Sequence, residues 1–146
     1  MRTIDAERVV DAPPAAVWRV LTDVSAYPEW NPFVTRVEGS FREGARPRVR
    51  IEPPGSRDLT FRPEVRVVRP ERQLVWAGHL VVPYLFDGRH EFRLEPIGDG
   101  DRTRLSQRET FTGLLVWLLL DADAVRRGFE AMNARLAERA ERLARA

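Results

Sequence analysis

The stretch Gly113–Ala146, GLLVWLLLDADAVRRGFEAMNARLAERAERLARA, decides the fold of this chain. A helix of about 30 residues would be about 45 Å long. Such a helix gains most of its stability by packing on an apolar surface, so the rest of the chain is expected to supply one. Its apolar residues recur in steps of three and four, which forms one stripe along a helix. The stripe consists of Leu118, Ala122, Val125, Phe129, Met132, Leu136, Ala140 and Leu143.

The N-terminal part of the chain predicts one strand followed by two short helical pieces. Residues 3–10 form the predicted strand, which Asp11-Ala12-Pro13-Pro14 ends. A proline is favourable in the first turn of a helix, so residues 15–21 are expected to form a short helix. The two prolines in Tyr27-Pro28-Glu29-Trp30-Asn31-Pro32-Phe33 limit this segment to a helical turn and an aromatic-rich loop.

From residue 34 onward, apolar and polar residues alternate, which is typical of strands with one buried face. Pro63 lies inside one of these runs and indicates an edge position or a bulge. Val81–Leu85 is predicted to be an apolar loop. The runs span residues 34–41, 47–51, 59–67, 74–80, 86–95 and 103–111. This order predicts an α+β fold in which a curved antiparallel sheet of about seven strands wraps on the long C-terminal helix.

Composition narrows the class of protein. The 146 residues are expected to form a single domain, residues 1–146, and the absence of cysteine excludes disulfides and thiolate metal sites. All 24 basic residues are arginine, as in proteins from GC-rich bacterial genomes, and they are interspersed with 22 acidic residues. The resulting net charge of +2 does not favour a nucleic-acid partner. No signal peptide is apparent, and Leu114–Leu120 is too short to span a membrane, so we expect a cytoplasmic protein without stable membrane insertion.

Several motifs in this order resemble the START-like helix-grip superfamily, also called SRPBCC, which includes polyketide cyclases/dehydrases and lipid-transport proteins. The motifs are Ala12-Pro13-Pro14-x-x-Val17-Trp18, Tyr27-Pro28-Glu29-Trp30-Asn31-Pro32, Leu74-x-Trp76-x-Gly78, Gly88-x-His90-x-Phe92-x-Leu94-x-Pro96, Thr103-Arg104-Leu105-x-Gln107-x-Glu109-x-Phe111-x-Gly113 and Phe129-x-x-Met132-Asn133. The resemblance covers essentially the whole chain. It implies a helix-grip fold with a deep apolar cavity between sheet and helix, open at one end, that binds a hydrophobic small molecule.

Three polar residues, His90, Gln107 and Glu109, fall on the predicted inner face of the sheet. His90 is interpreted either as a neutral histidine bonded to Gln107 or to backbone, or as a donor to a ligand carbonyl, or as a general acid/base. Glu109 is expected to bond His90, an arginine or a polar ligand group, because a buried carboxylate needs a partner. His79 is placed on the outer face, so the two histidines do not form a metal site, and neither metal nor cofactor is expected.

Aromatic side chains are the other candidates for contact with a ligand, although about half of them would serve equally well as ordinary core. The full set of predicted ligand-binding residues is Trp30, Phe33, Phe61, Trp76, Tyr84, Phe86, His90, Phe92, Gln107, Glu109, Phe111 and Phe129. The run Leu114–Leu120 is apolar on all sides. It is interpreted either as covered by flanking loops or as a cavity lid, a dimer contact or a tip that touches a membrane.

Three functional hypotheses follow. The leading one is a non-catalytic binder of a lipid, polyketide or quinone-like molecule. The second is a polyketide cyclase or dehydratase in which His90 and Glu109 form the acid/base pair. The third is a protein-interaction or dimerisation module that uses Leu114–Leu120.

Overall fold

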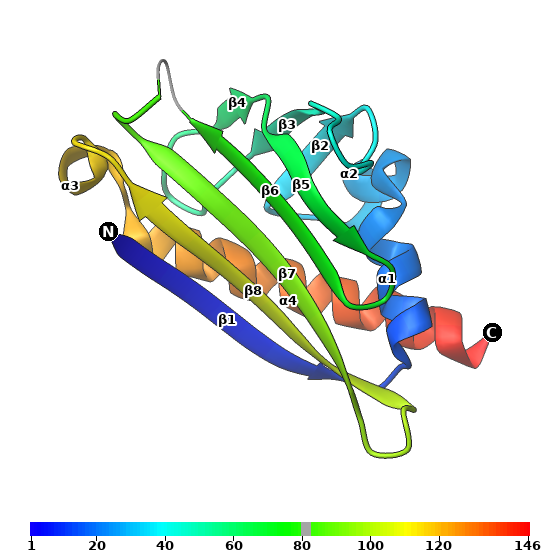
Figure 1. Ribbon diagram of the computed structural model, residues 1–146. Helices are drawn as coiled ribbons and strands as arrows, with labels where there is room; N and C mark the ends of the chain where they lie inside the picture. The colour runs from blue at the N-terminus through cyan, green and yellow to red at the C-terminus, as the bar shows by residue number, and fades with distance from the viewer. Residues whose placement is uncertain (80–82) are drawn as a thin grey trace.

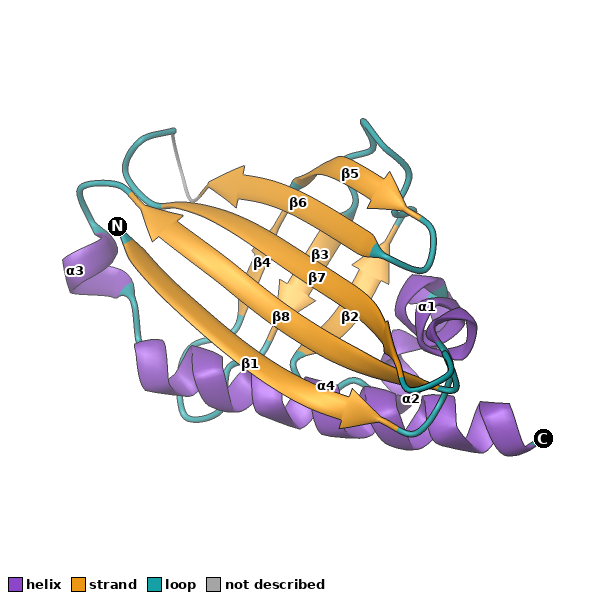
Figure 2. Ribbon diagram, turned by 60° about the horizontal axis from the view of Figure 1, so that its bottom comes forward, coloured by secondary structure: helices purple, strands orange, loops and turns teal. Residues whose placement is uncertain are grey.

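The computed structural model describes residues 1–79 and 83–146, and it has the predicted α+β architecture with a long helix lying along one face of antiparallel strands (Figure 1). Figure 2 shows α4 running beneath the strands from the neighbourhood of α3 to beyond α1. The strands are β1 (Arg2–Val10), β2 (Val34–Glu38), β3 (Arg48–Ile51), β4 (Leu59–Phe61), β5 (Glu64–Arg69), β6 (Gln73–His79), β7 (Asp87–Ile97) and β8 (Arg102–Thr112). The helices are α1 (Pro14–Thr22), the short 3-10 helix η1 (Val24–Ala26), α2 (Tyr27–Trp30), α3 (Val116–Leu119) and α4 (Ala122–Arg145).

The strands form two antiparallel sheets. Strands β1-β8-β7-β6-β5 form a five-stranded sheet, and β2-β3-β4 form a three-stranded sheet. The fold class is as predicted, but the single strand expected at 59–67 is divided into β4 and β5. Pro63 explains the division, because it is buried between the two strands and has no N–H to donate to a strand ladder.

The long C-terminal helix is also interrupted, contrary to the prediction of one continuous helix. Asp121 has an extended backbone, and its side chain accepts a hydrogen bond from the backbone N–H of Ala124, as an N-cap residue does. Helix α4 therefore begins at Ala122, and its apolar stripe from Val125 to Ala140 is buried. Leu118, predicted as part of this stripe, lies in α3 instead, and 79% of its surface is exposed.

At the C-terminal end of α4, the interior is filled by side chains. Leu94 and Leu105 are opposite each other in β7 and β8, and both belong to the same buried cluster as Leu136 and Ala140 of α4. Helix α1 packs against α4 at this end. Tyr27 of α2 is fully buried as well, and its phenol donates a 2.5 Å hydrogen bond to the carbonyl of Leu21. Burial, with a smaller contribution from Asp23, holds the pKa of Tyr27 above its usual value.

Near its N-terminal end, α4 approaches the segment after α2 closely. The ring of Phe33 lies against Gly128, so close that a Cβ atom at this position would clash with the ring. Phe33 also meets Phe129 edge-on, with ring centroids 5.5 Å apart. These contacts attach the three-stranded sheet to α4 while leaving space between that sheet and β6–β8. None of the helices described has both the length and the apolar content required to cross a bilayer.

Candidate functional site

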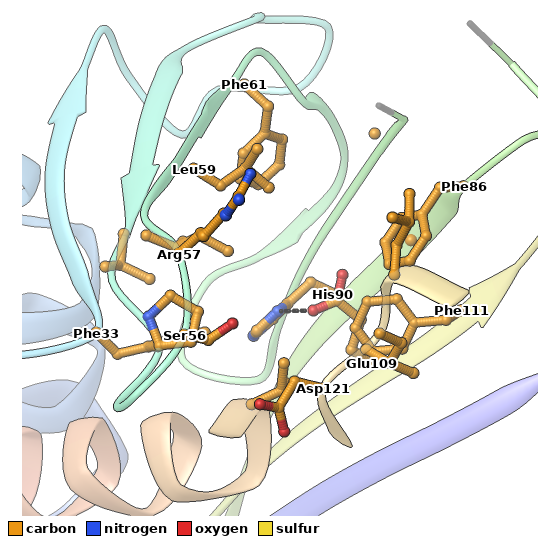
Figure 3. Close-up of a pocket in the computed structure, with 18 of the residues that line it drawn as sticks. Phe33, Ser56, Arg57, Leu59, Phe61, Phe86, His90, Glu109, Phe111 and Asp121 are labelled. Atoms are coloured by element: carbon orange, nitrogen blue, oxygen red, sulfur yellow. Dashed lines mark hydrogen bonds and ion pairs between the residues drawn. The ribbon is translucent and has the colours of Figure 1, made fainter. Parts of the chain in front are cut away.

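A cavity of about 450 Å³ lies between the three-stranded sheet, strands β6–β8 and the N-terminal end of α4 (Figure 3). Its apolar lining comes from Phe33, Val34, Ile51, Pro53, Leu59, Phe61, Trp76, Phe86, Phe111, Leu119, Leu120 and Val125. The polar lining comes from Ser56, Arg57, Asp58, His79, His90, Glu109 and Asp121. The cavity is therefore mainly apolar, with few polar groups, as sites for small organic ligands usually are.

Two glycines lie at the end of the sheet where the cavity forms. Gly78 and Gly88 are directly opposite each other in β6 and β7, and both line the cavity. Because neither residue has a side chain, the side chains of Glu109 and Phe61 can lie directly against the strands here. At the other end of the same strands, Leu74 and Phe92 form the corresponding pair and are fully buried.

His90 and Glu109 form the most distinctive polar contact in the cavity. They are opposite each other in β7 and β8, and His90 Nδ1 lies 3.0 Å from Glu109 Oε1. The other ring nitrogen, Nε2, lies 3.0 Å from Gln107 Oε1. His90 is 3% exposed and Glu109 is 16% exposed at the side chain, so the pair lies at the boundary between the core and the cavity.

The hydrogen bonds continue from Gln107 into α4 and β1. Gln107 Nε2 donates to Asn133 Oδ1 at 2.6 Å and to the carbonyl of Phe129 at 3.4 Å. Asn133 Nδ2 donates to the carbonyl of Ala6 at 3.4 Å. Sequence analysis gave Asn133 no role, although a polar residue four positions after Phe129 on the buried stripe is a signal that could have identified it.

Three aromatic rings surround the His90 imidazole. Its centroid lies 4.9 Å from Trp76, 4.6 Å from Phe92 and 5.0 Å from Phe129. This packing and the two hydrogen bonds fix the orientation of the ring. Both ring nitrogens are already engaged, so donation from His90 to a ligand carbonyl, which is one interpretation of the sequence, would require one of these hydrogen bonds to break.

The predicted ligand-binding residues fall into three groups. One group lines the cavity: Phe33, Phe61, Trp76, Phe86, His90, Glu109 and Phe111. A second group is buried and does not line the cavity: Trp30, Phe92, Gln107 and Phe129. Tyr84 belongs to neither group, because it is 81% exposed and has a positive φ of 75° in the loop before β7. The alternation of a strand does not extend into a loop, so it gave no valid direction for this side chain.

The polar loop between β3 and β4 was not recognised as part of the site. Ser56, Arg57 and Asp58 line the cavity, and Asp58 forms a 2.7 Å ion pair with Arg50. The sequence showed only a turn at Pro53-Pro54-Gly55, and loops have no periodicity that would indicate which side chains point inward. His79, predicted on the outer face, is exposed but contributes to the lining. The predicted loop Val81–Leu85 lies partly outside the described residues.

The apolar run Leu114–Leu120 is mostly exposed, so the prediction that flanking loops cover it is wrong. Leu114, Trp117, Leu118 and Leu119 are exposed, with Trp117 at 95%. Helix α3 has only one turn, so it cannot bury a face by itself. Leu119 and Leu120 also line the cavity, which places this exposed tip directly beside it.

The described residues contain no group of three or more side chains placed to hold a metal ion. The polar groups that face the cavity are carboxylates, an arginine, a serine and histidines. This set suits hydrogen bonding and proton transfer with an organic ligand.

Comparison of this chain with known proteins identifies its family. The family profile described as polyketide cyclase/dehydrase and lipid transport matches residues 1–141. No curated protein matches the sequence.

Solved structures have a similar fold at low sequence identity. TTHA0849 from Thermus thermophilus is 21% identical, with a TM-score of 0.76 over 97% of this chain and 99% of that chain. Protein MLL2253 from Mesorhizobium loti is 23% identical, with a TM-score of 0.72 over 97% of this chain and 98% of that chain. A START superfamily protein from Mycobacterium smegmatis is 18% identical, with a TM-score of 0.66 over 98% of this chain and 97% of that chain.

Proposed function

The chain belongs to the polyketide cyclase/dehydrase and lipid transport family, and from that premise we propose that it binds a hydrophobic or amphipathic small molecule. The binding site is the cavity between the two sheets and α4, and the ligand is of the lipid, polyketide or quinone type. The observation that carries the proposal is the cavity itself, because about 450 Å³ of mainly aromatic and aliphatic lining lies within the usual size range of ligand sites.

The lining supports an apolar ligand that carries a few polar groups. Phe33, Phe61, Phe86 and Phe111 provide broad apolar contact, and the apolar area that a ligand buries against them drives binding. The polar groups are concentrated at His90–Glu109 and at the loop that contains Arg57 (Figure 3). A few polar groups in an apolar pocket fix the orientation of a ligand.

A cavity-filling substitution tests the proposal. Ile51→Trp places an indole in the cavity, whereas Val68→Trp alters a half-buried β-branched residue that does not line it. We expect the wild type and Val68→Trp to bind the neutral dye Nile red at one saturable site, and Ile51→Trp to bind it at least tenfold more weakly. Mass spectrometry of solvent extracts then identifies any co-purified ligand that the same substitution removes. Absence of saturable binding in the wild type, or equal binding in Ile51→Trp, would contradict the proposal.

A second candidate function is catalysis of the cyclase or dehydratase type. It is favoured by the 3.0 Å contact of His90 with Glu109 beside the cavity, which meets the geometric condition for an acid/base pair. The pair would move a proton to or from carbon or oxygen of a polyketide-like substrate. The test is turnover of poly-β-ketone substrates by the wild type, His90→Ala and Glu109→Gln, with Glu95→Gln, at an exposed position outside the cavity, as the control. Turnover that survives both His90→Ala and Glu109→Gln would exclude this role.

A further inference from the structure

We infer that Glu109 Oε2 is a hydrogen-bond acceptor subsite that selects ligands carrying a hydroxyl or another N–H or O–H donor. The inference rests on the proposed function, because it concerns the ligand that the cavity holds. The argument begins from the hydrogen-bond chain behind the cavity wall, which determines the direction of every bond up to Glu109.

Backbone carbonyls fix the orientation of the two amide side chains. A carbonyl oxygen only accepts, so Asn133 must direct its NH₂ group at Ala6, and Gln107 must direct its NH₂ group at Phe129. Asn133 Oδ1 then accepts from Gln107, consistent with their 2.6 Å contact. Both side chains are almost completely buried, at 2% exposed or less, so reversing either amide would leave buried groups without partners.

This orientation determines the tautomer of His90. Gln107 presents Oε1 to the imidazole, and an amide oxygen only accepts, so His90 Nε2 must carry a proton. The remaining nitrogen, Nδ1, faces Glu109 Oε1 at 3.0 Å. One proton lies between these two atoms, either as Nδ1–H donating to a carboxylate or as Oε1–H of a carboxylic acid donating to Nδ1. In both arrangements Oε1 is occupied by the histidine.

The second carboxylate oxygen, Oε2, is therefore free of protons in either arrangement and can only accept. It lies directly over Gly88, so close that a Cβ atom there would clash with it. Gly88 and Glu109 both line the cavity, and no described residue donates a hydrogen bond to Oε2. Gly88 makes room for the carboxylate, and the Glu109 side chain is 16% exposed and lines the cavity, so its unengaged oxygen is the one available to a ligand beside Phe111.

An acceptor in this position discriminates between ligands of similar shape. A hydroxyl, phenol or protonated amine satisfies Oε2, whereas an ether or ketone of the same outline displaces its water without replacing the hydrogen bond. Carboxylate and phosphate groups are disfavoured at this point, because they also only accept. The preferred ligand is an apolar ring or chain with a hydroxyl directed at the β7–β8 pair.

Two pyrene derivatives test the subsite. 1-Hydroxypyrene has the donor, 1-methoxypyrene lacks it, and both fluoresce at wavelengths separate from tryptophan. We expect the wild type to bind 1-hydroxypyrene about tenfold more tightly, which corresponds to one hydrogen bond of about 1.4 kcal/mol. Glu109→Leu should remove this preference. Glu95→Leu is the matched control, because it makes the same substitution at an exposed carboxylate of β7 that does not line the cavity, and it should keep the preference.

The outcomes separate the subsite from the proposed function. Binding of both pyrenes with equal affinity by the wild type would overturn the subsite and leave the cavity intact as a ligand site. If the wild type binds neither compound, the proposed function fails and the subsite with it.

A second measurement is made on the wild type and uses a variant only to assign the signals. The chain has two histidines, so ¹⁵N labelling gives two imidazole spin systems, and His79→Asn identifies the signal of His90. The hydrogen-bond chain predicts that His90 Nε2 carries a proton. An unprotonated Nε2 would reverse the direction of the chain and overturn the inference.

Discussion

The two ends of the interior along α4 use the same strands but differ in what fills them. At the C-terminal end of α4, Leu94 and Leu105 are buried in the cluster that also contains Leu136. At the other end, Gly88 and Glu109 occupy the same two strands, and a cavity of about 450 Å³ remains. The comparison shows that side-chain size and polarity on a shared backbone determine where the molecule is solid and where it can receive a ligand.

The largest expected effect contrasts a leucine at each end. Leu105→Ala removes a fully buried side chain and should lower the free energy of unfolding by about 3 kcal/mol. Leu120→Ala, in the cavity wall and only half-buried, should cost less than about 1 kcal/mol because no sealed void is created. Urea denaturation of the two variants measures both values. Equal losses would mean that the cavity end is packed as tightly as the other end.

The hydrogen bonds that run from Gln107 through His90 to Glu109 connect the core with the cavity. Loss of a side chain should cost more stability at the buried end than at the cavity end. Gln107→Leu leaves buried groups of His90 and Asn133 without a partner and should cost about 2–3 kcal/mol. Glu109→Gln keeps the size of a residue that is open to the cavity, so it should cost about 1 kcal/mol. Urea denaturation compares the two. A larger loss for Glu109→Gln would contradict the assignment of Gln107 as the buried anchor.

Substitutions at Gly78 and Gly88 test the packing at the cavity end with smaller expected effects. Gly88→Ala places a methyl group against Glu109 Oε2, so it should displace the carboxylate from His90 and cost about 1 kcal/mol. Gly78→Ala meets the edge of Phe61 at 3.2 Å and Pro63 Cα at 3.4 Å, so a small shift of the Phe61 ring accommodates it and the cost should be smaller. The ¹⁵N signal of His90 should move in Gly88→Ala and stay in place in Gly78→Ala. The same spectrum for both variants would show that Gly88 does not make room for the carboxylate.

The smallest effect on stability is expected at the exposed tip. The double variant Leu118→Arg, Leu119→Arg alters side chains that are mostly in solvent, so its free energy of unfolding should stay within about 0.5 kcal/mol of the wild type. Sedimentation velocity of both proteins tests the third hypothesis, an interaction module at Leu114–Leu120. A dimer that the double variant dissociates would support that hypothesis, and an identical mass and solubility would argue against it.

The fold class was predicted correctly because long periodic segments and turn residues specify it, and the family was identified correctly from the resemblance of several motifs. Alternation also placed His90 and Glu109 on the inner face, where the structure brings them together. The break at Asp121 was missed, because the apolar spacing continues across the cap residue and conceals it.

The remaining errors concern positions where the local sequence pattern does not indicate which way a side chain points. Tyr84 was assigned to the site although it lies in a loop, and Arg57 was omitted although its loop folds over the cavity. Neither position has the regular backbone that converts sequence spacing into orientation. The direction of the hydrogen bonds through Asn133 depends on a contact with Ala6, far away in the sequence, which no local pattern records.

The central claim, that the α3 end of the interior holds a hydrophobic molecule while the other end is solid, is tested most directly by nuclear Overhauser effects. The experiment uses methyl-labelled protein with bound 1-hydroxypyrene. The account predicts contacts from the pyrene ring to the methyl groups of Ile51 and Val125, and none to those of Leu105. Contacts confined to Leu114 and Leu118 would place the compound on the exposed tip instead and would contradict the account.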